Sequence, residues 1–145
     1  MRLCEHPALL AAALGVLLAA SPALAAGDLA IKATKLEPLE IGGGDAGYGV
    51  SNDTYELEMG KSYRLEIKQV GPHGCEWDAA EFSRNIWLRK IDVGHVSIDT
   101  PTFESFDLDE DTDIEITFVP IRTGEFSWEC EGLDEQGMEG TFVVK

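Results

Sequence analysis

Apolar and polar residues alternate along most of the chain after residue 50. The clearest runs are residues 55–59 and 63–68, in which every second position is apolar and the positions between are charged or polar. A period of two is typical of a half-buried β-strand, because successive side chains point to opposite faces. Gly60 and Lys61 form a turn between the two runs, so we expect a hairpin or a sheet corner here.

Five further segments have strand character and are separated by clusters of Gly, Pro, Asp and Asn: residues 85–91, 96–98, 114–118, 125–130 and 140–144. No long run has helical spacing, and the best helix candidate, residues 78–84, spans at most two turns. Many short strands with regular turns predict an all-β domain, either a Greek-key β-sandwich or a barrel.

Several smaller features have simple structural interpretations. We interpret the glycine-rich residues 42–47 as a flexible loop rather than a phosphate cradle. The acidic residues 107–113 lack the spacing and glycine of an EF-hand, so we expect a solvated turn. Because aromatic side chains dominate sandwich interiors, the three tryptophans are expected in the core; they are Trp77, Trp87 and Trp128. His95 is expected at the surface or at a strand edge.

The first 25 residues differ in character from the rest of the chain. A short basic start is followed by an apolar run over residues 8–20 and a small-residue triplet at 23–25. This order matches a secretory signal peptide cleaved after Ala25, with the Ala26/Gly27 boundary as an almost equal choice. The run is shorter than the roughly 20 residues of a spanning helix. We therefore expect a cleaved signal peptide at 1–25, a single domain at 26–145, no membrane span, and a periplasmic or secreted protein.

The mature chain is strongly acidic. Of the 11 Lys and Arg and the 27 Asp and Glu, only Arg2 and Glu5 lie in residues 1–25, so the mature net charge stays at −16. Such a polyanion repels nucleic acid and anionic membranes and attracts basic proteins or metal cations. We expect no nucleic-acid partner. A basic redox or metal-transfer protein is the partner that this charge suits, and solubility alone is the alternative explanation.

Nothing in the sequence points to enzyme chemistry. The patterns H-E-x-x-H, G-x-S-x-G and the Walker motif do not occur. A nucleophilic cysteine needs a base in reach and an electropositive setting, whereas Cys130 lies between Glu129 and Glu131. We therefore expect that the protein is not an enzyme.

The last part of the chain resembles the closing hairpin of the cupredoxins. It has a strand with a turn at Pro120, then the alternating segment 126–130 that ends in Cys130, and then Met138 before the last strand. Residues 60–67 are similar to the family's first long core strand, so the resemblance covers most of the mature chain. It implies a cupredoxin-like fold.

The resemblance also implies an altered copper site. Cupredoxin sites use two His, one Cys and a weak axial Met. Here Cys130 matches the thiolate and Met138 the axial thioether, but Leu133 stands at the second histidine position. Cys75 stands at the first, and His73 is the alternative imidazole close by. The implied metal ligands are therefore Cys75, Cys130 and Met138, with His73 as a further candidate, a soft set that prefers Cu(I) and does not make a blue copper centre.

The same alignment places both cysteines in one site, where an oxidising compartment favours a Cys75–Cys130 disulfide. The chain-entropy estimate for such a loop is about 4 kcal/mol of stabilisation. A soft metal cluster and free or reactive thiols are the alternatives. Two functions remain open: copper handling, by Cu(I) binding or in electron transfer, and a metal-free periplasmic binding or scaffold module with the disulfide in place of the copper site.

Overall fold

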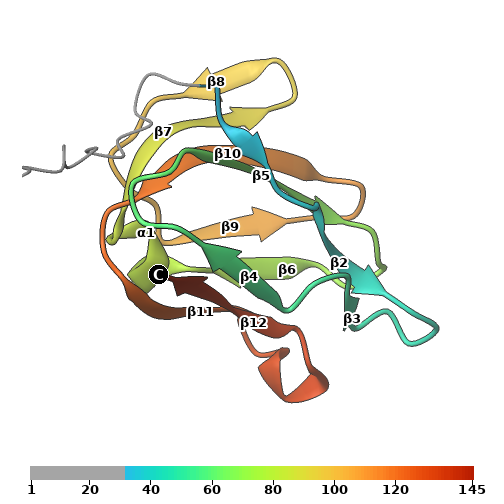
Figure 1. The fold of residues 1–145 in the computed structure, drawn as a ribbon. Helices are drawn as coiled ribbons and strands as arrows, with labels where there is room; N and C mark the ends of the chain where they lie inside the picture. The colour runs from blue at the N-terminus through green and yellow to red at the C-terminus, as the bar shows by residue number, and fades with distance from the viewer. Residues whose placement is uncertain (1–31) are drawn as a thin grey trace, which may run out of the picture.

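The computed structural model describes residues 32–145, so the expected signal peptide lies outside the described part of the chain. Two β-sheets pack face to face (Figure 1). The first sheet has the order β3-β2-β5-β10-β7-β8, with β1 also paired to β5. Its strands are β1 (Thr34–Lys35), β2 (Leu39–Gly43), β3 (Gly49–Val50), β5 (Tyr63–Gln69), β7 (Ile86–Val93), β8 (Val96–Ile98) and β10 (Asp113–Pro120).

The second sheet has the order β4-β12-β11-β6-β9. Its strands are β4 (Thr54–Leu57), β6 (Cys75–Asp78), β9 (Ser105–Leu108), β11 (Gly124–Cys130) and β12 (Glu139–Val144). Only one helical turn, α1 (Ala80–Ser83), and one 3-10 turn, η1 (Asp134–Gln136), interrupt the strands of the described residues. The structure confirms the predicted all-β sandwich and all seven strand segments expected from the alternating pattern.

The turn at Gly60 is a sheet corner and not a hairpin. β4 pairs in parallel with β12 in the second sheet, whereas β5 pairs with β10 in the first. The chain therefore crosses between the sheets at Gly60, which has a φ of 83° that suits glycine. The Gly60 N–H donates to the Pro120 carbonyl (2.8 Å) and fixes the corner.

Aromatic side chains fill the space between the sheets. Phe82 of α1 stacks on Phe142 with ring centroids 3.9 Å apart and meets Phe118 edge-on at 5.2 Å. Trp77 and Trp128 are fully buried, and their ring centroids are 6.3 Å apart. Such contacts contribute about 0.5–1.5 kcal/mol per pair beyond burial, so this cluster ties α1 and both sheets together.

The prediction for Trp87 is wrong. Its side chain is 44% exposed, because on β7 the neighbouring positions Ile86 and Leu88 point inward and the strand period sends Trp87 outward. The Arg89 guanidinium lies over its ring, 5.9 Å from the centroid.

The predicted loop at residues 42–47 is shorter than expected. Gly42 and Gly43 belong to β2, and the turn begins at residue 44. Glycine is needed here because β2 passes very close to Gly71: a Cβ on Gly71 would lie 2.2 Å from the Gly42 carbonyl oxygen. The acidic residues 107–113 form the end of β9, a turn at 109–112 and the start of β10. Within residues 32–145, no helix is long and apolar enough to cross a membrane.

Candidate functional site

The two candidate cysteines lie on neighbouring strands of the second sheet. Cys75 is the first residue of β6 and Cys130 is the last residue of β11, and the two strands run antiparallel with Cys130 opposite Trp77. Both side chains face the core, because the alternation along each strand places them on the same side as the buried tryptophans. The two Cα atoms are 5.1 Å apart, and the sulfurs form a disulfide. The disulfide implied by the resemblance is present.

The disulfide is shielded from solvent. Cys75 is 1% exposed and Cys130 is 0% exposed. Both belong to the hydrophobic core that includes Trp77, Trp128 and Met138. The bond therefore joins the two strands from inside the sandwich rather than at its surface.

The segment that follows Cys130 is a tight turn. Its backbone folds around η1, with Gly132 (φ 75°) and Gly137 (φ 91°) in the left-handed region on either side. The Leu133 N–H donates to the Cys130 carbonyl, and the Cys130 N–H donates to the Met138 carbonyl, both at 2.8 Å. These bonds fix Met138 beside Cys130, just before β12 begins.

Met138 and Leu133 have different environments. The Met138 side chain is fully buried in the core. Leu133 is partly buried and packs against the core from the turn. It stands where the resemblance places a histidine, and its aliphatic side chain offers no donor atom for a metal.

His73 contacts a different part of the molecule. Its ring stacks on Tyr48, with centroids 4.3 Å apart and planes inclined by 6°. Its Nε2 lies 3.2 Å from the Ala46 carbonyl oxygen, and its own carbonyl accepts a hydrogen bond from the Gln69 side-chain amide. These contacts tie His73 to the turn after β2. His95 is exposed in the turn between β7 and β8, as predicted.

The copper set of a cupredoxin does not fit the residues found here. The Cys130 sulfur is bonded to Cys75, and a disulfide sulfur is not the thiolate that copper needs. Leu133 and Cys75 stand where the resemblance places the two histidines. Across residues 32–145, no three His, Cys, Asp or Glu side chains are grouped so that they could hold a metal ion.

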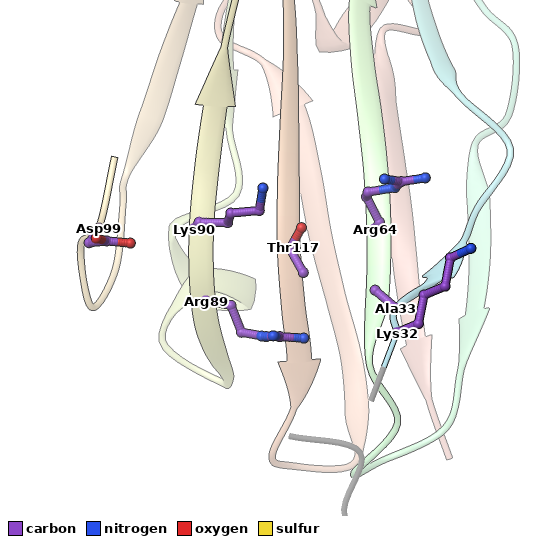
Figure 2. Close-up of a pocket in the computed structure, with 7 residues that line it drawn as sticks. All are labelled: Lys32, Ala33, Arg64, Arg89, Lys90, Asp99 and Thr117. Atoms are coloured by element: carbon purple, nitrogen blue, oxygen red, sulfur yellow. The ribbon is translucent and has the colours of Figure 1, made fainter. Parts of the chain in front are cut away.

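A second feature was not anticipated from the sequence. A hollow of about 400 Å³ lies on the first sheet, across β5, β10 and β7 (Figure 2). Four of its lining residues are cationic, so we call it the basic hollow. Its lining residues are Lys32, Ala33, Arg64, Arg89, Lys90, Asp99 and Thr117.

Comparisons with known proteins identify the fold. No family model and no curated protein matches the sequence. Among solved structures, a multicopper oxidase from Pediococcus acidilactici is similar with a TM-score of 0.57 and 12% identity over 98% of this chain and 31% of that one. A multicopper oxidase from Campylobacter jejuni has a TM-score of 0.55 and 8% identity over 79% of this chain and 30% of that one.

A reduced auracyanin from the photosynthetic bacterium Roseiflexus castenholzii is also similar, with a TM-score of 0.52 and 13% identity over 79% of this chain. The match covers 99% of the auracyanin, whereas this chain spans about a third of the length of the two oxidases. At these identities the likeness concerns the fold. The chain therefore has a cupredoxin-like fold, with a buried disulfide joining Cys75 to Cys130.

Proposed function

We propose that the protein is an exported, metal-free and non-catalytic binding or scaffold module, in which the Cys75–Cys130 disulfide takes the structural place of a copper ion. The observation that carries the proposal is the disulfide itself, because it occupies the sulfur that would bind the metal. The pattern of residues 1–25 supports export to a periplasmic or secreted location. A structural disulfide fits such an oxidising compartment.

The burial of the disulfide favours a structural role over a redox role. Thiol–disulfide exchange begins when a thiolate attacks one of the sulfurs, so its rate depends on access. Both Cys75 and Cys130 are almost completely inaccessible. The exposed side chains next to Cys130 are Glu129 and Glu131, which repel an approaching thiolate. The bond therefore serves as a permanent clip between β6 and β11.

A second candidate function is Cu(I) carriage after reduction, in copper handling or beside an electron-transfer chain. The observation that favours it is the buried Met138, hydrogen-bonded through its backbone to Cys130. A dithiol reductant would convert the Cys75–Cys130 bond to two thiols and itself become a disulfide. Two thiolates and a thioether form a soft set that suits Cu(I), and the acidic surface would then attract a basic metal-transfer or redox partner.

Anaerobic competition with a colorimetric Cu(I) chelator tests the two functions. The oxidised protein should remove no copper from the chelator, and Cu(II) should produce no intense visible thiolate band. One copper bound per oxidised chain would contradict the metal-free proposal.

The same competition on reduced protein tests the second candidate. One-to-one binding that weakens in Met138→Leu would support Cu(I) carriage. Met59→Leu is the matched control, because Met59 is 50% exposed and lies away from the core. Equal binding by both variants, or no binding after reduction, would exclude a Cys–Met copper site.

A further inference from the structure

The register of three strands builds the basic hollow. Arg64 of β5 lies opposite Thr117 of β10, and Thr117 lies opposite Lys90 of β7. Residues in register on adjacent strands point to the same face. The three side chains therefore form one row across the first sheet, as Figure 2 shows with Thr117 between Lys90 and Arg64.

A β-bulge adds a third cation, Arg89, to the same place. The pairing of β7 with β10 goes from Lys90↔Thr117 to Leu88↔Phe118, so Arg89 is an extra residue without an opposite partner in the ladder. A bulge re-aims the side chain at the inserted position, and both Arg89 and Lys90 line the hollow although they are adjacent in sequence. Lys32 reaches the other side from the residues before β1.

The charge of this hollow is opposite to that of the protein. Residues 32–145 contain 10 Lys and Arg and 25 Asp and Glu. Four of those 10 cations line the basic hollow, whereas only one of the 25 carboxylates, Asp99, does so. This local concentration of positive charge attracts anions, whereas the net charge of −16 repels them from the rest of the protein.

Nearby carboxylates neutralise part of this charge. The Arg64 Nε lies 3.3 Å from Glu115 Oε2, and Lys90 forms an ion pair with Asp92. Glu115 and Asp92 lie opposite each other in the next row of the same face, two residues before Thr117 and two residues after Lys90, respectively. They flank the hollow but do not line it, so they orient the cations without occupying the space between them.

Thr117 supplies the observation that points to a ligand. It is only 5% exposed, and its Oγ1 is buried with no hydrogen-bond partner among the described residues. The Arg64 Nε is likewise buried without a hydrogen bond, although Glu115 Oε2 lies 3.3 Å from it. Leaving such groups unsatisfied costs about 1–3 kcal/mol each. The Thr117 hydroxyl can donate, so an acceptor-rich ligand in the hollow would satisfy it.

We propose that the basic hollow binds a small oxyanion with two or more negative charges, as the ligand of the binding module proposed above. Thr117 Oγ1 donates to the anion, and Arg64, Arg89, Lys90 and Lys32 surround it with positive charge. Guanidinium groups match phosphate and carboxylate geometry. The volume of about 400 Å³ is within the range of roughly 300–1,000 Å³ typical of small-molecule sites, and the acidic remainder of the surface repels a long polyanion.

A titration of the mature, oxidised protein followed by ¹⁵N–¹H NMR tests this. Inorganic phosphate and citrate are added separately at constant ionic strength, with NaCl as the reference. The amides of Arg64, Lys90 and Thr117 should shift and saturate with at least one of the two anions. Saturation with phosphate alone would identify the ligand as a tetrahedral anion. Saturation with citrate alone would identify it as a polycarboxylate. No saturable shift with either anion beyond that of NaCl would overturn the proposal.

Two variants and a control establish where the anion binds. Thr117→Val keeps the side-chain shape but removes the hydroxyl donor, and it should weaken binding about tenfold or more. Lys90→Gln, at an exposed position, should also weaken binding and tests the charge without a change in the core. Lys145→Gln is the control, because Lys145 pairs with Glu56 on the other sheet. Equal affinity of Thr117→Val and wild type, or an equal loss in Lys145→Gln, would contradict the assigned site.

This experiment is separate from the test of the proposed function. The thiol and copper content of the sample is measured before the titration and does not depend on anion binding. A failed titration with an intact disulfide refutes the anion site alone. Copper in the sample would refute the metal-free proposal whatever the titration shows.

Discussion

Removal of the Cys75–Cys130 bond should be among the most destabilising changes available in this protein. The bond links residues 55 apart in sequence. In the chain-entropy treatment, closing a loop of this length in the unfolded state contributes about 4 kcal/mol of stability. Single domains are typically stable by roughly 5–15 kcal/mol. The double variant Cys75→Ala/Cys130→Ala should therefore lose about 4 kcal/mol, and lost packing of two buried sulfurs acts in the same direction.

Guanidinium denaturation monitored by tryptophan fluorescence measures this loss, because Trp77 and Trp128 lie in the same core as the bond. The denaturation midpoint should fall. The slope of the free energy against denaturant should rise, because the unfolded chain exposes more surface when it is not cross-linked. Wild-type protein denatured with a strong reductant present should give nearly the same curve as the double variant.

Ser127→Ala is the matched control for this measurement. Ser127 lies on β11, the same strand as Cys130, but its side chain is exposed. Its replacement should change the free energy of unfolding by less than about 0.5 kcal/mol. A double cysteine variant that loses less than about 1 kcal/mol would refute the reasoning, since the two strands would then be held without the bond.

Substitutions of Gly71, Tyr55 and Trp87 test three other parts of the structure. Gly71→Ala places a methyl group 2.2 Å from the Gly42 carbonyl oxygen and should cost about 2 kcal/mol or more in urea denaturation. Gly43→Ala, whose nearest neighbour would be 3.7 Å away, should cost less, and equal losses would argue against the close approach of the strands. Burial raises the pKa of Tyr55 from 10.0 to about 12, partly offset by a hydrogen bond with Asn52. The folded state thus keeps the proton that the unfolded chain loses, so the stabilisation from the neutral phenol is complete below pH 10 and is lost between pH 10 and 12. The Tyr55→Phe variant should therefore lose less folding stability than wild type between pH 10 and 12. An equal loss of stability in the two proteins would contradict the raised pKa of Tyr55. Acrylamide should quench the fluorescence of the exposed Trp87 but not that of the buried Trp77 and Trp128. The Trp87→Phe variant should therefore lose most of the quenching. Strong quenching in that variant would contradict the burial of Trp77 and Trp128.

Alternation alone was enough to predict the long strands. In β5 the apolar residues Tyr63, Leu65 and Ile67 all face the core. In such strands, the alternation of apolar and polar residues in the sequence matches the alternation of buried and exposed side chains. The short strands β1, β3 and β9 have only two to four residues and contain charged or glycine positions. Their conformation depends on pairing with a neighbouring strand, and the local sequence pattern gives no information about that pairing.

The sites differ in how far the sequence could predict them. The disulfide followed from a family resemblance, because Cys75 and Cys130 took the positions of two ligands. The basic hollow did not, since Arg64, Lys90 and Thr117 are far apart in sequence and meet only through strand register and the bulge at Arg89. The one local signal was the pair Arg89-Lys90, two adjacent cations within a strand in which alternate residues should point inward. Trp87 was misplaced because residue type was given more weight than its position in that same strand.

The most direct test of the account is the intact mass, thiol count and copper content of the mature protein, purified without reductant from the compartment to which it is exported. The metal-free proposal predicts a mass two hydrogens below that of the reduced chain, no thiol that reacts under denaturing conditions, and no copper. Two titratable thiols, or one copper ion per chain held by Cys130, would contradict it.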